Sequence, residues 1–192
     1  MVVGVLALQG DFEAHAGVLL RLGAEPRIVR TPGDLEGLDG LVIPGGESTT
    51  MTLGIEREGL AEPLRDLVRA GTPTLGTCAG LIMLDRDHLD VLDVRARRNA
   101  FGRQVKSFEA DVELDGIDGG PLRAVFIRAP WVDECGDDVE VLGEIDGHPI
   151  AVSEGNILAV AFHPELTDDG RVHEWLVERI RERTASAEGQ AA

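Results

Sequence analysis

Residues 74–84 read TLGTCAGLIML, an apolar stretch with a single cysteine, Cys78, near its middle. The first residues supply a buried strand, and the run from Ala79 onward predicts a buried helix. A nucleophile at such a sharp turn from strand to helix is crowded by its neighbours, and small residues such as Gly76 and Gly80 relieve that crowding. The stretch therefore predicts an α/β fold with a nucleophile at the end of a strand.

The position of Cys78 favours a reactive thiol. The dipole and the free N–H groups at a helix N-terminus stabilise the thiolate, which is the form that attacks. Taken alone, the cysteine is equally well interpreted as a small buried apolar residue. A second element is needed to decide between the two.

That second element is the sequence His163-Pro164-Glu165. Proline pushes the residue before it into an extended conformation, and an extended chain brings every second residue to the same side. Glu165 can then hold one tautomer of His163 while the other ring nitrogen faces a sulfur. Without Cys78, a strand end with a solvated glutamate and a half-buried histidine would be the better interpretation.

A glycine turn at residues 44–49, PGGEST, is the third element. Two adjacent glycines expose backbone N–H groups, and Gly46 together with the amide of Ala79 is suited to bind an oxyanion. The alternative is a turn capped by Ser48 or Thr49 before a helix, and both interpretations can hold at once.

Further out, apolar runs alternate with amphipathic stretches, which predicts a mostly parallel, doubly wound sheet in three αβα layers. The predicted strands here are residues 2–8, 28–29, 41–43 and 74–75, with a helix at 60–70. Ligands in such sheets bind beyond the carboxyl ends of the strands, so Gln9, Gly46 and Cys78 are expected in one crevice. His15 falls on the apolar stripe of the helix after the first strand, so we interpret it as a satisfied histidine at the edge of the core.

From residue 107 the pattern changes to short strands separated by glycine turns. We expect residues 108–114, 122–127, 139–145, 150–153 and 157–161 to add antiparallel strands to one side of the sheet. An amphipathic helix that includes Trp175 closes the chain. We predict one domain over residues 1–183 and a flexible C-terminal tail over residues 184–192.

The composition indicates a compact cytoplasmic enzyme. A chain of 192 residues that is 43% hydrophobic suits one α/β domain. With 18 basic and 35 acidic residues its net charge is −17, which repels nucleic acid and anionic membranes. It has no apolar run of about 18 residues and no basic leader, so neither membrane insertion nor secretion is expected.

The remaining cysteine, histidine and arginine residues carry weaker signals. Cys135 lies in an acidic stretch interpreted as a loop, and we expect both cysteines to be free. The histidines at 15, 88, 148 and 173 show no ligand pairing, so we predict no metal and no cofactor. A basic cluster of Arg95, Arg97, Arg98, Arg103 and Lys106 is interpreted as a site for a carboxylate or a partner, or as a balance for nearby acids.

These residues resemble a known family. The sequences GTCAG at 76–80 and HPE at 163–165 are similar to the triad of class I glutamine amidotransferases. Six segments, in the family's order, resemble the PdxT/SNO family, the glutaminase subunits of pyridoxal 5'-phosphate synthase: VLALQG at 5–10, PGGESTTM at 44–51, RNAFGRQ at 98–104, SFEAD at 107–111, FIRAP at 126–130 and FHPELT at 162–167. The resemblance covers residues 2–183, and only residues 85–94 look shorter than is usual in the family.

The resemblance implies hydrolysis of L-glutamine to L-glutamate and ammonia by a triad of Cys78, His163 and Glu165. It also implies a glutamine site lined by Gly46, Glu47, Ser48, Arg98, Ile127 and Arg128. The implied partner is the barrel-shaped synthase subunit of a hetero-oligomer that makes pyridoxal 5'-phosphate, or vitamin B6. Two alternatives remain, which are a cysteine hydrolase or chaperone of the DJ-1/PfpI kind and a catalytically silent regulatory subunit.

Overall fold

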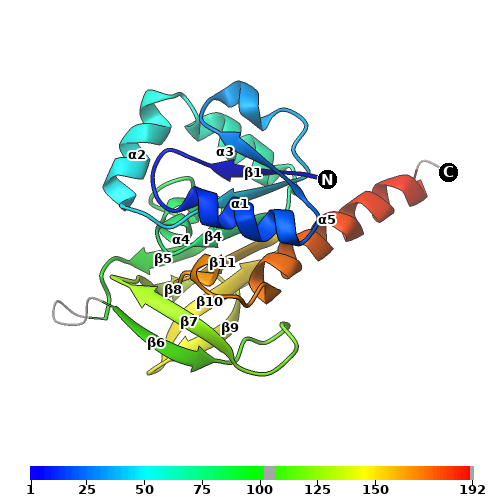
Figure 1. Ribbon diagram of the computed structural model, residues 1–192. Coiled ribbons are helices and arrows are strands. Elements are labelled where there is room, and N and C mark those ends of the chain that lie inside the picture. The colour runs from blue at the N-terminus through cyan, green and yellow to red at the C-terminus, as the bar shows by residue number, and fades with distance from the viewer. Residues whose placement is uncertain (102–106, 191–192) are drawn as a thin grey trace.

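A seven-stranded mixed sheet forms the middle layer of the molecule (Figure 1). The structure is a computed structural model, and it describes residues 1–101 and 107–190. In order across the sheet the strands are β2 (Glu25–Val29), β1 (Val2–Leu6), β3 (Gly40–Ile43), β4 (Thr74–Thr77), β11 (Ile157–Val160), β10 (His148–Glu154) and β9 (Glu140–Ile145). The first five are parallel, whereas β10 runs antiparallel to both of its neighbours.

Helices cover both faces of this sheet, and the strands show why. Successive side chains of a strand point to opposite faces, so Leu41 and Ile43 of β3 enter one apolar core while Val42 enters the other. The first core is closed by α2 (Ser48–Arg57), α3 (Ala61–Arg69) and α4 (Ala79–Leu84), and the second by α1 (Phe12–Arg21) and α5 (Arg171–Gln190). The predicted αβα architecture is confirmed.

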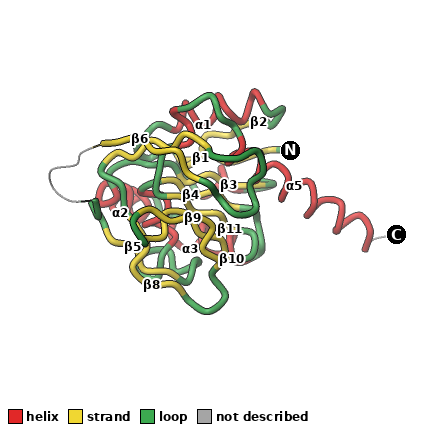
Figure 2. The backbone as a smooth tube through the Cα atoms, turned by 90° about the horizontal axis from the view of Figure 1, so that it is seen from below, coloured by secondary structure: helices red, strands yellow, loops and turns green. Residues whose placement is uncertain are grey.

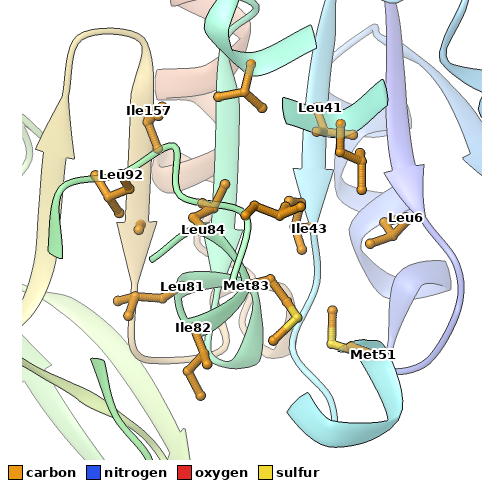
Figure 3. Packing of buried hydrophobic residues seen from close by; sticks show 14 of the residues in the cluster. Leu6, Leu41, Ile43, Met51, Leu81, Ile82, Met83, Leu84, Leu92 and Ile157 are labelled. Atoms are coloured by element: carbon orange, nitrogen blue, oxygen red, sulfur yellow. The ribbon is translucent and has the colours of Figure 1, made fainter. Parts of the chain in front are cut away.

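The first core lies directly beside the predicted nucleophile. Figure 3 shows Leu81 and Met83 on opposite sides of α4, with Met83 on the side nearer Met51 of α2. Met51 and Leu81 are fully buried, and Met83 is 1% exposed. Burying one such side chain contributes about 1.5–3 kcal/mol. This packing fixes the short helix that follows Cys78.

The later part of the chain departs from the prediction. Beside the main sheet lie two antiparallel ribbons, β5 (Val94–Arg97) with β8 (Trp131–Cys135) and β6 (Ser107–Val112) with β7 (Leu122–Ile127). Strand β11 joins the main sheet in parallel to β4, so its predicted antiparallel direction was wrong. The acidic stretch around Cys135 was predicted as a loop but is strand β8. Local sequence gives strand propensity, whereas strand direction depends on partners far along the chain.

The closing helix is longer than predicted. It continues as α5 to Gln190, beyond the start of the predicted tail at residue 184, and its last part extends away from the body (Figures 1 and 2). Alanine is the strongest helix former and occupies positions 185 and 187 of this extension, which favours the continuation. Residues 191–192 lie outside the described residues. In the part of the chain that the structure describes, two short 3-10 helices, η1 (Pro32–Leu35) and η2 (Pro164–Leu166), complete the secondary structure.

Within the described residues, no helix combines the length and apolar character that crossing a membrane requires.

Candidate active site

Cys78 lies at a strained turn between β4 and α4, as the sequence predicts. Its backbone has φ 49° and ψ −106°, a conformation that residues other than glycine rarely adopt. A Cβ atom on Gly80 would overlap the carbonyl oxygen of Ile43, and one on Gly76 would crowd Leu84. Gly80 is therefore required by close approach of the Ile43 backbone, and Gly76 by close approach of the Leu84 side chain and the Gly80 backbone.

His163 and Glu165 come together through a different local structure from the one predicted. His163 follows β11, but Glu165 lies in the 3-10 helix η2, so a helical turn and not an extended strand brings them to the same side. His163 Nδ1 lies 2.7 Å from Glu165 Oε1. If Nδ1 carries the proton, Nε2 is left for the sulfur. The predicted pairing of these two residues is confirmed.

The electrostatics of His163 favour a charged ring. Burial by itself would lower its pKa, but hydrogen bonds with Cys78 and Glu165 outweigh burial and raise the pKa to about 10. His163 thus retains its proton at neutral pH beside the sulfur of Cys78. The sulfur also lies 3.9 Å from the carbonyl oxygen of Ile127.

The glycine turn after β3 packs against the first strand end. A Cβ on Gly46 would overlap the side-chain oxygen of Gln9, and that oxygen accepts a hydrogen bond from the amide of Glu47. The carbonyl of Gly45 faces Gly10, where a Cβ would likewise overlap it. Gln9 and Gly10, which follow β1, therefore pack closely against Gly45 and Gly46, which follow β3.

The N-cap of α2 is Glu47, whereas the sequence pointed to Ser48 or Thr49. The Glu47 carboxylate accepts from the amides of Thr49 at 3.1 Å and Thr50 at 2.8 Å, so it caps the helix in place of Ser48 or Thr49. The hydroxyl of Thr50, followed by these amides, lowers the pKa of Glu47 to about 2. Glu47 is therefore an anion at the mouth of the site.

The predicted residues gather around one pocket of about 170 Å³. This is smaller than the about 300–1,000 Å³ typical for drug-sized ligands, so it suits a small molecule such as one amino acid. Its lining is Gln9, Gly46, Glu47, Ser48, Cys78, Ala79, Ile82, Arg98, Asn99, Ile127, Arg128, Pro130 and His163. The expected crevice shared by Gln9, Gly46 and Cys78 is confirmed, and all six residues implied for the substrate lie there.

The basic cluster divides into two kinds of residue. Arg95 and Arg97 form ion pairs with the acids of β8, at 3.0 Å to Glu134 and 2.9 Å to Asp133. Arg98 instead reaches the pocket, where it donates to Glu47 at 3.2 Å and to the Thr49 hydroxyl. Arg103 and Lys106 lie outside the described residues.

Sequence reasoning missed several pocket residues. Ile82, Asn99 and Pro130 line the pocket but carried no catalytic signal of their own. Asn99 and Arg128 both have positive φ, 48° and 46°. Asparagine tolerates that conformation, and its place directly after Arg98 was the one available hint.

A further group of polar residues lies buried behind Glu165. His15 is fully buried and hydrogen-bonded, so it is a satisfied histidine as predicted, although it lies deeper than the core edge. Its partner His173 was not predicted to pair with it.

Both cysteines are free. Within residues 1–101 and 107–190, no three His, Cys, Asp or Glu side chains are arranged to hold a metal ion.

The three-layer sheet with a cysteine at its strand-to-helix turn defines a glutamine amidotransferase-like α/β protein. A solved glutamine amidotransferase is 46% identical, with a TM-score of 0.87, over 94% of this chain and 99% of its own. Another glutamine amidotransferase, from Thermotoga maritima, shares the fold at 15% identity and a TM-score of 0.63, over 98% of this chain and 85% of its own.

The chain belongs to the SNO glutamine amidotransferase family, whose model matches residues 5–182. It is 53% identical to the pyridoxal 5'-phosphate synthase subunit PdxT of Mycobacteroides abscessus, over 93% of this chain and 97% of that protein. It is 54% identical to the PdxT subunit of Acidothermus cellulolyticus, over 93% of each. Membership in this family decides against the DJ-1/PfpI alternative.

Proposed function

We propose that this chain is the glutaminase subunit of a pyridoxal 5'-phosphate synthase. It hydrolyses L-glutamine to L-glutamate and ammonia and passes the ammonia to a synthase subunit for vitamin B6 biosynthesis. The observation that supports this most directly is the position of Cys78 at a strained turn, on a small pocket that His163 also lines. Similarity to PdxT subunits over 93% of the chain supports the partner.

The first half of the reaction forms a thioester. The Cys78 thiolate attacks the side-chain amide carbon of glutamine, and the amides of Gly46 and Ala79 bind the oxyanion that develops. His163 gives its proton to the nitrogen, the carbon–nitrogen bond breaks and ammonia leaves. The raised pKa of His163 suits this step because the proton is in place at neutral pH.

The second half returns the enzyme to its starting state. Neutral His163 takes a proton from water, the hydroxide attacks the γ-glutamyl thioester, and glutamate departs as the sulfur becomes thiolate again. Glu165 keeps His163 in the required tautomer and stabilises its charged form. The 2.7 Å contact between them supports this assignment.

The glutamine head group is assigned to the polar side of the pocket. Arg98 already donates to Glu47, whereas the side chain of Arg128 makes no hydrogen bond within the described residues. We therefore assign the α-carboxylate of glutamine to Arg128 and the α-amino group to the Glu47 carboxylate. Charge-assisted hydrogen bonds of this kind contribute about 1.5–3 kcal/mol.

Besides receiving the ammonia, the synthase subunit is proposed to complete the oxyanion hole when it binds. The carbonyl of Gly45 now faces Gly10, and glycine permits the peptide between Gly45 and Gly46 to turn over at low cost. Ammonia released into water is protonated and lost as a nucleophile, so activation on docking avoids waste. Equal turnover with and without the synthase would contradict this switch.

The test is glutamate release from L-glutamine, measured with and without the synthase subunit. We expect release that depends on the synthase and disappears in Cys78→Ala. Cys135→Ala, at the exposed second cysteine, is the matched control and should keep full activity. No release under any condition would leave a silent regulatory subunit, and release that survives Cys78→Ala would exclude the proposed nucleophile.

A further inference from the structure

Three polar side chains with no part in the proposed chemistry are buried directly behind Glu165. They are His15 on α1, Thr77 at the end of β4 and His173 on α5, and each has 0% exposure. A buried polar group costs free energy unless it is hydrogen-bonded. Three such groups next to a catalytic carboxylate therefore call for a functional explanation.

The contacts connect His15 to Glu165. His15 Nδ1 lies 2.9 Å from His173 Nε2, and His15 Nε2 lies 3.2 Å from Thr77 Oγ1 and 3.3 Å from Glu165 Oε2. The other carboxylate oxygen, Oε1, contacts His163 at 2.7 Å. The Glu165 carboxylate thus lies between two histidines, one of them facing each oxygen.

The hydrogen-bond pattern selects one tautomer of a neutral His15. With the proton on Nε2, His15 faces Oε2 and Thr77 as a donor, and Nδ1 accepts from the Nε2–H of His173. The His173 Nδ1 atom has no partner among the described residues, and it is then a bare acceptor. In the opposite tautomer, with the proton of His15 on Nδ1, His173 Nδ1 would carry a buried N–H without a partner. The lone pair of His15 Nε2 would then face a lone pair of Glu165 Oε2, and both effects cost more free energy.

We propose that His15 is a positioning residue whose Nε2–H holds the second oxygen of Glu165 and so fixes the carboxylate that orients His163. This inference rests on the proposed Cys78-His163-Glu165 triad. Within the described residues the buried Oε2 atom has no hydrogen bond, and His15 Nε2 lies 3.3 Å from it, close enough to supply one after a small adjustment. His173 acts one step further away, by setting the tautomer of His15.

The charges around the pair suit a neutral donor. Burial, then the neighbouring His173 and His163, lower the pKa of His15 well below its ordinary value. Burial and the charge of Arg21 lower the pKa of His173 to about 4. A neutral His15 can orient the carboxylate without competing as a second cation, so Glu165 remains available to the charged His163.

Two substitutions of similar size separate positioning from mere packing. In His15→Gln the side-chain amide nitrogen reaches the place of Nε2, so a donor toward Glu165 is kept. In His15→Asn the amide reaches only the place of Nδ1, so contact with His173 is kept and the donor to Glu165 is lost. Both variants remain polar and buried, and thermal unfolding reports how far each is destabilised.

The readout is glutaminase kinetics in the complex with the synthase, together with the pH dependence of Cys78 alkylation by iodoacetamide, followed on the Cys78 peptide by mass spectrometry. For His15→Asn we expect kcat to fall about tenfold with KM nearly unchanged. We also expect its alkylation curve to move up by about one pH unit, because a loose carboxylate stabilises the imidazolium–thiolate pair less. His15→Gln should restore both properties.

Equal behaviour of the two variants, whether both like the wild type or both impaired, would overturn the proposal. Glu165→Gln separates this failure from failure of the triad, because it should shift the alkylation curve whatever His15 does. If neither His15 variant folds, nitrogen-15 NMR of the wild-type chain tests the proposal, because it identifies which ring nitrogen of His15 carries the proton. A His15 ring protonated on Nε2 supports the proposal, and one protonated on Nδ1 contradicts it.

Discussion

The five parallel strands and the antiparallel strands β5–β10 contribute different things to the same pocket. Cys78, His163 and the glycine turn at Gly46 follow parallel strands whose ends meet at one edge of the sheet. Arg98, Ile127 and Arg128 lie at the ends of antiparallel ribbons that cover this edge. The parallel part therefore carries the proposed bond-breaking groups, and the antiparallel part carries three of the six residues assigned to the substrate, including the arginine assigned to its α-carboxylate.

This division has a physical reason. Parallel strands buried on both faces are fixed by two cores, so groups at their ends are positioned accurately, as covalent chemistry requires. The ribbons are exposed on one side and linked by turns. Their sequence can change at less cost to the fold, which suits residues that determine specificity. Variants of the bond-breaking groups or of the tight turns in the first part should thus alter kcat or stability, and variants of the arginines in the second should alter KM.

The largest effect is expected from Glu165→Gln. The amide no longer stabilises a charged His163 and can hold it in the wrong tautomer, so we expect kcat to fall about 10³-fold with KM little changed. Steady-state glutaminase assays of the complex measure this. Glu144→Gln on β9, exposed and away from the pocket, is the control. A change confined to KM would contradict the division between the two parts.

The next effect is a graded loss of stability from alanine at three helical glycines. Gly80→Ala sets a methyl group against the Ile43 carbonyl and should cost about 3 kcal/mol of unfolding free energy or more. Gly54→Ala meets Leu8 at 3.3 Å and should cost less, because a side chain can move. Gly17→Ala meets only an arginine tip at 4.0 Å and should stabilise α1 by about 0.5–1 kcal/mol.

Urea unfolding of the three variants measures these differences. The order of stability, with Gly17→Ala above and Gly80→Ala far below the wild type, follows from the space at each site. If Gly80→Ala were as stable as Gly17→Ala, the tight packing that we assign to the turn at Cys78 would be wrong.

A smaller effect is expected on substrate binding. Arg128→Ala should raise KM for glutamine about tenfold or more, with kcat changed much less, because it removes a charge-assisted contact to the α-carboxylate. Arg123→Ala on β7, which pairs with Glu109 and Asp111 outside the pocket, is the matched control. A loss of kcat alone would place Arg128 among the chemical groups.

The smallest effect is expected from pH between 7 and 9, where turnover should change less than about twofold. The pKa of His163 is raised above its unfolded value near 6.5, so the charged ring is the dominant form until pH approaches about 10. Its contribution to stability is complete below the unfolded pKa and is lost as pH rises through the folded one. Activity should fall along with it above about pH 10.

NMR titration of the histidine rings checks the cause. In Cys78→Ala the sulfur is gone, so the pKa of His163 should drop below its value in the wild type. A drop would confirm that the sulfur supports the raised pKa, whereas an unchanged value would assign it to Glu165 alone. His88 pairs with Asp85 at 2.7 Å, away from the sulfur, and provides an internal reference.

Much of the site could be predicted because its signals are local. Glycines around Cys78 and the proline after His163 restrict the backbone within a few residues, so their consequences can be derived without knowing the fold. The presence of strands β1 to β4 was predictable for the same reason, since a buried strand is a short apolar run, although β1 ends at Leu6 and not at residue 8, and β4 ends at Thr77 and not at residue 75. The errors include the Glu47 cap and strands β8 and β11, where partners compete or lie far apart. The 3-10 turn at Glu165 and the full length of α5 were also not predicted.

The sequence by itself determined the αβα class, the reactive turn and the members of the proposed triad, because spacing and residue type specify them locally. Only the tertiary structure decided that Arg98 pairs with Glu47, that Gln9 fits against Gly46, and that two buried histidines lie behind Glu165. His15 and His173 are 158 residues apart in the chain. Such contacts arise when separate elements pack on a common sheet, and no local pattern in the sequence encodes them.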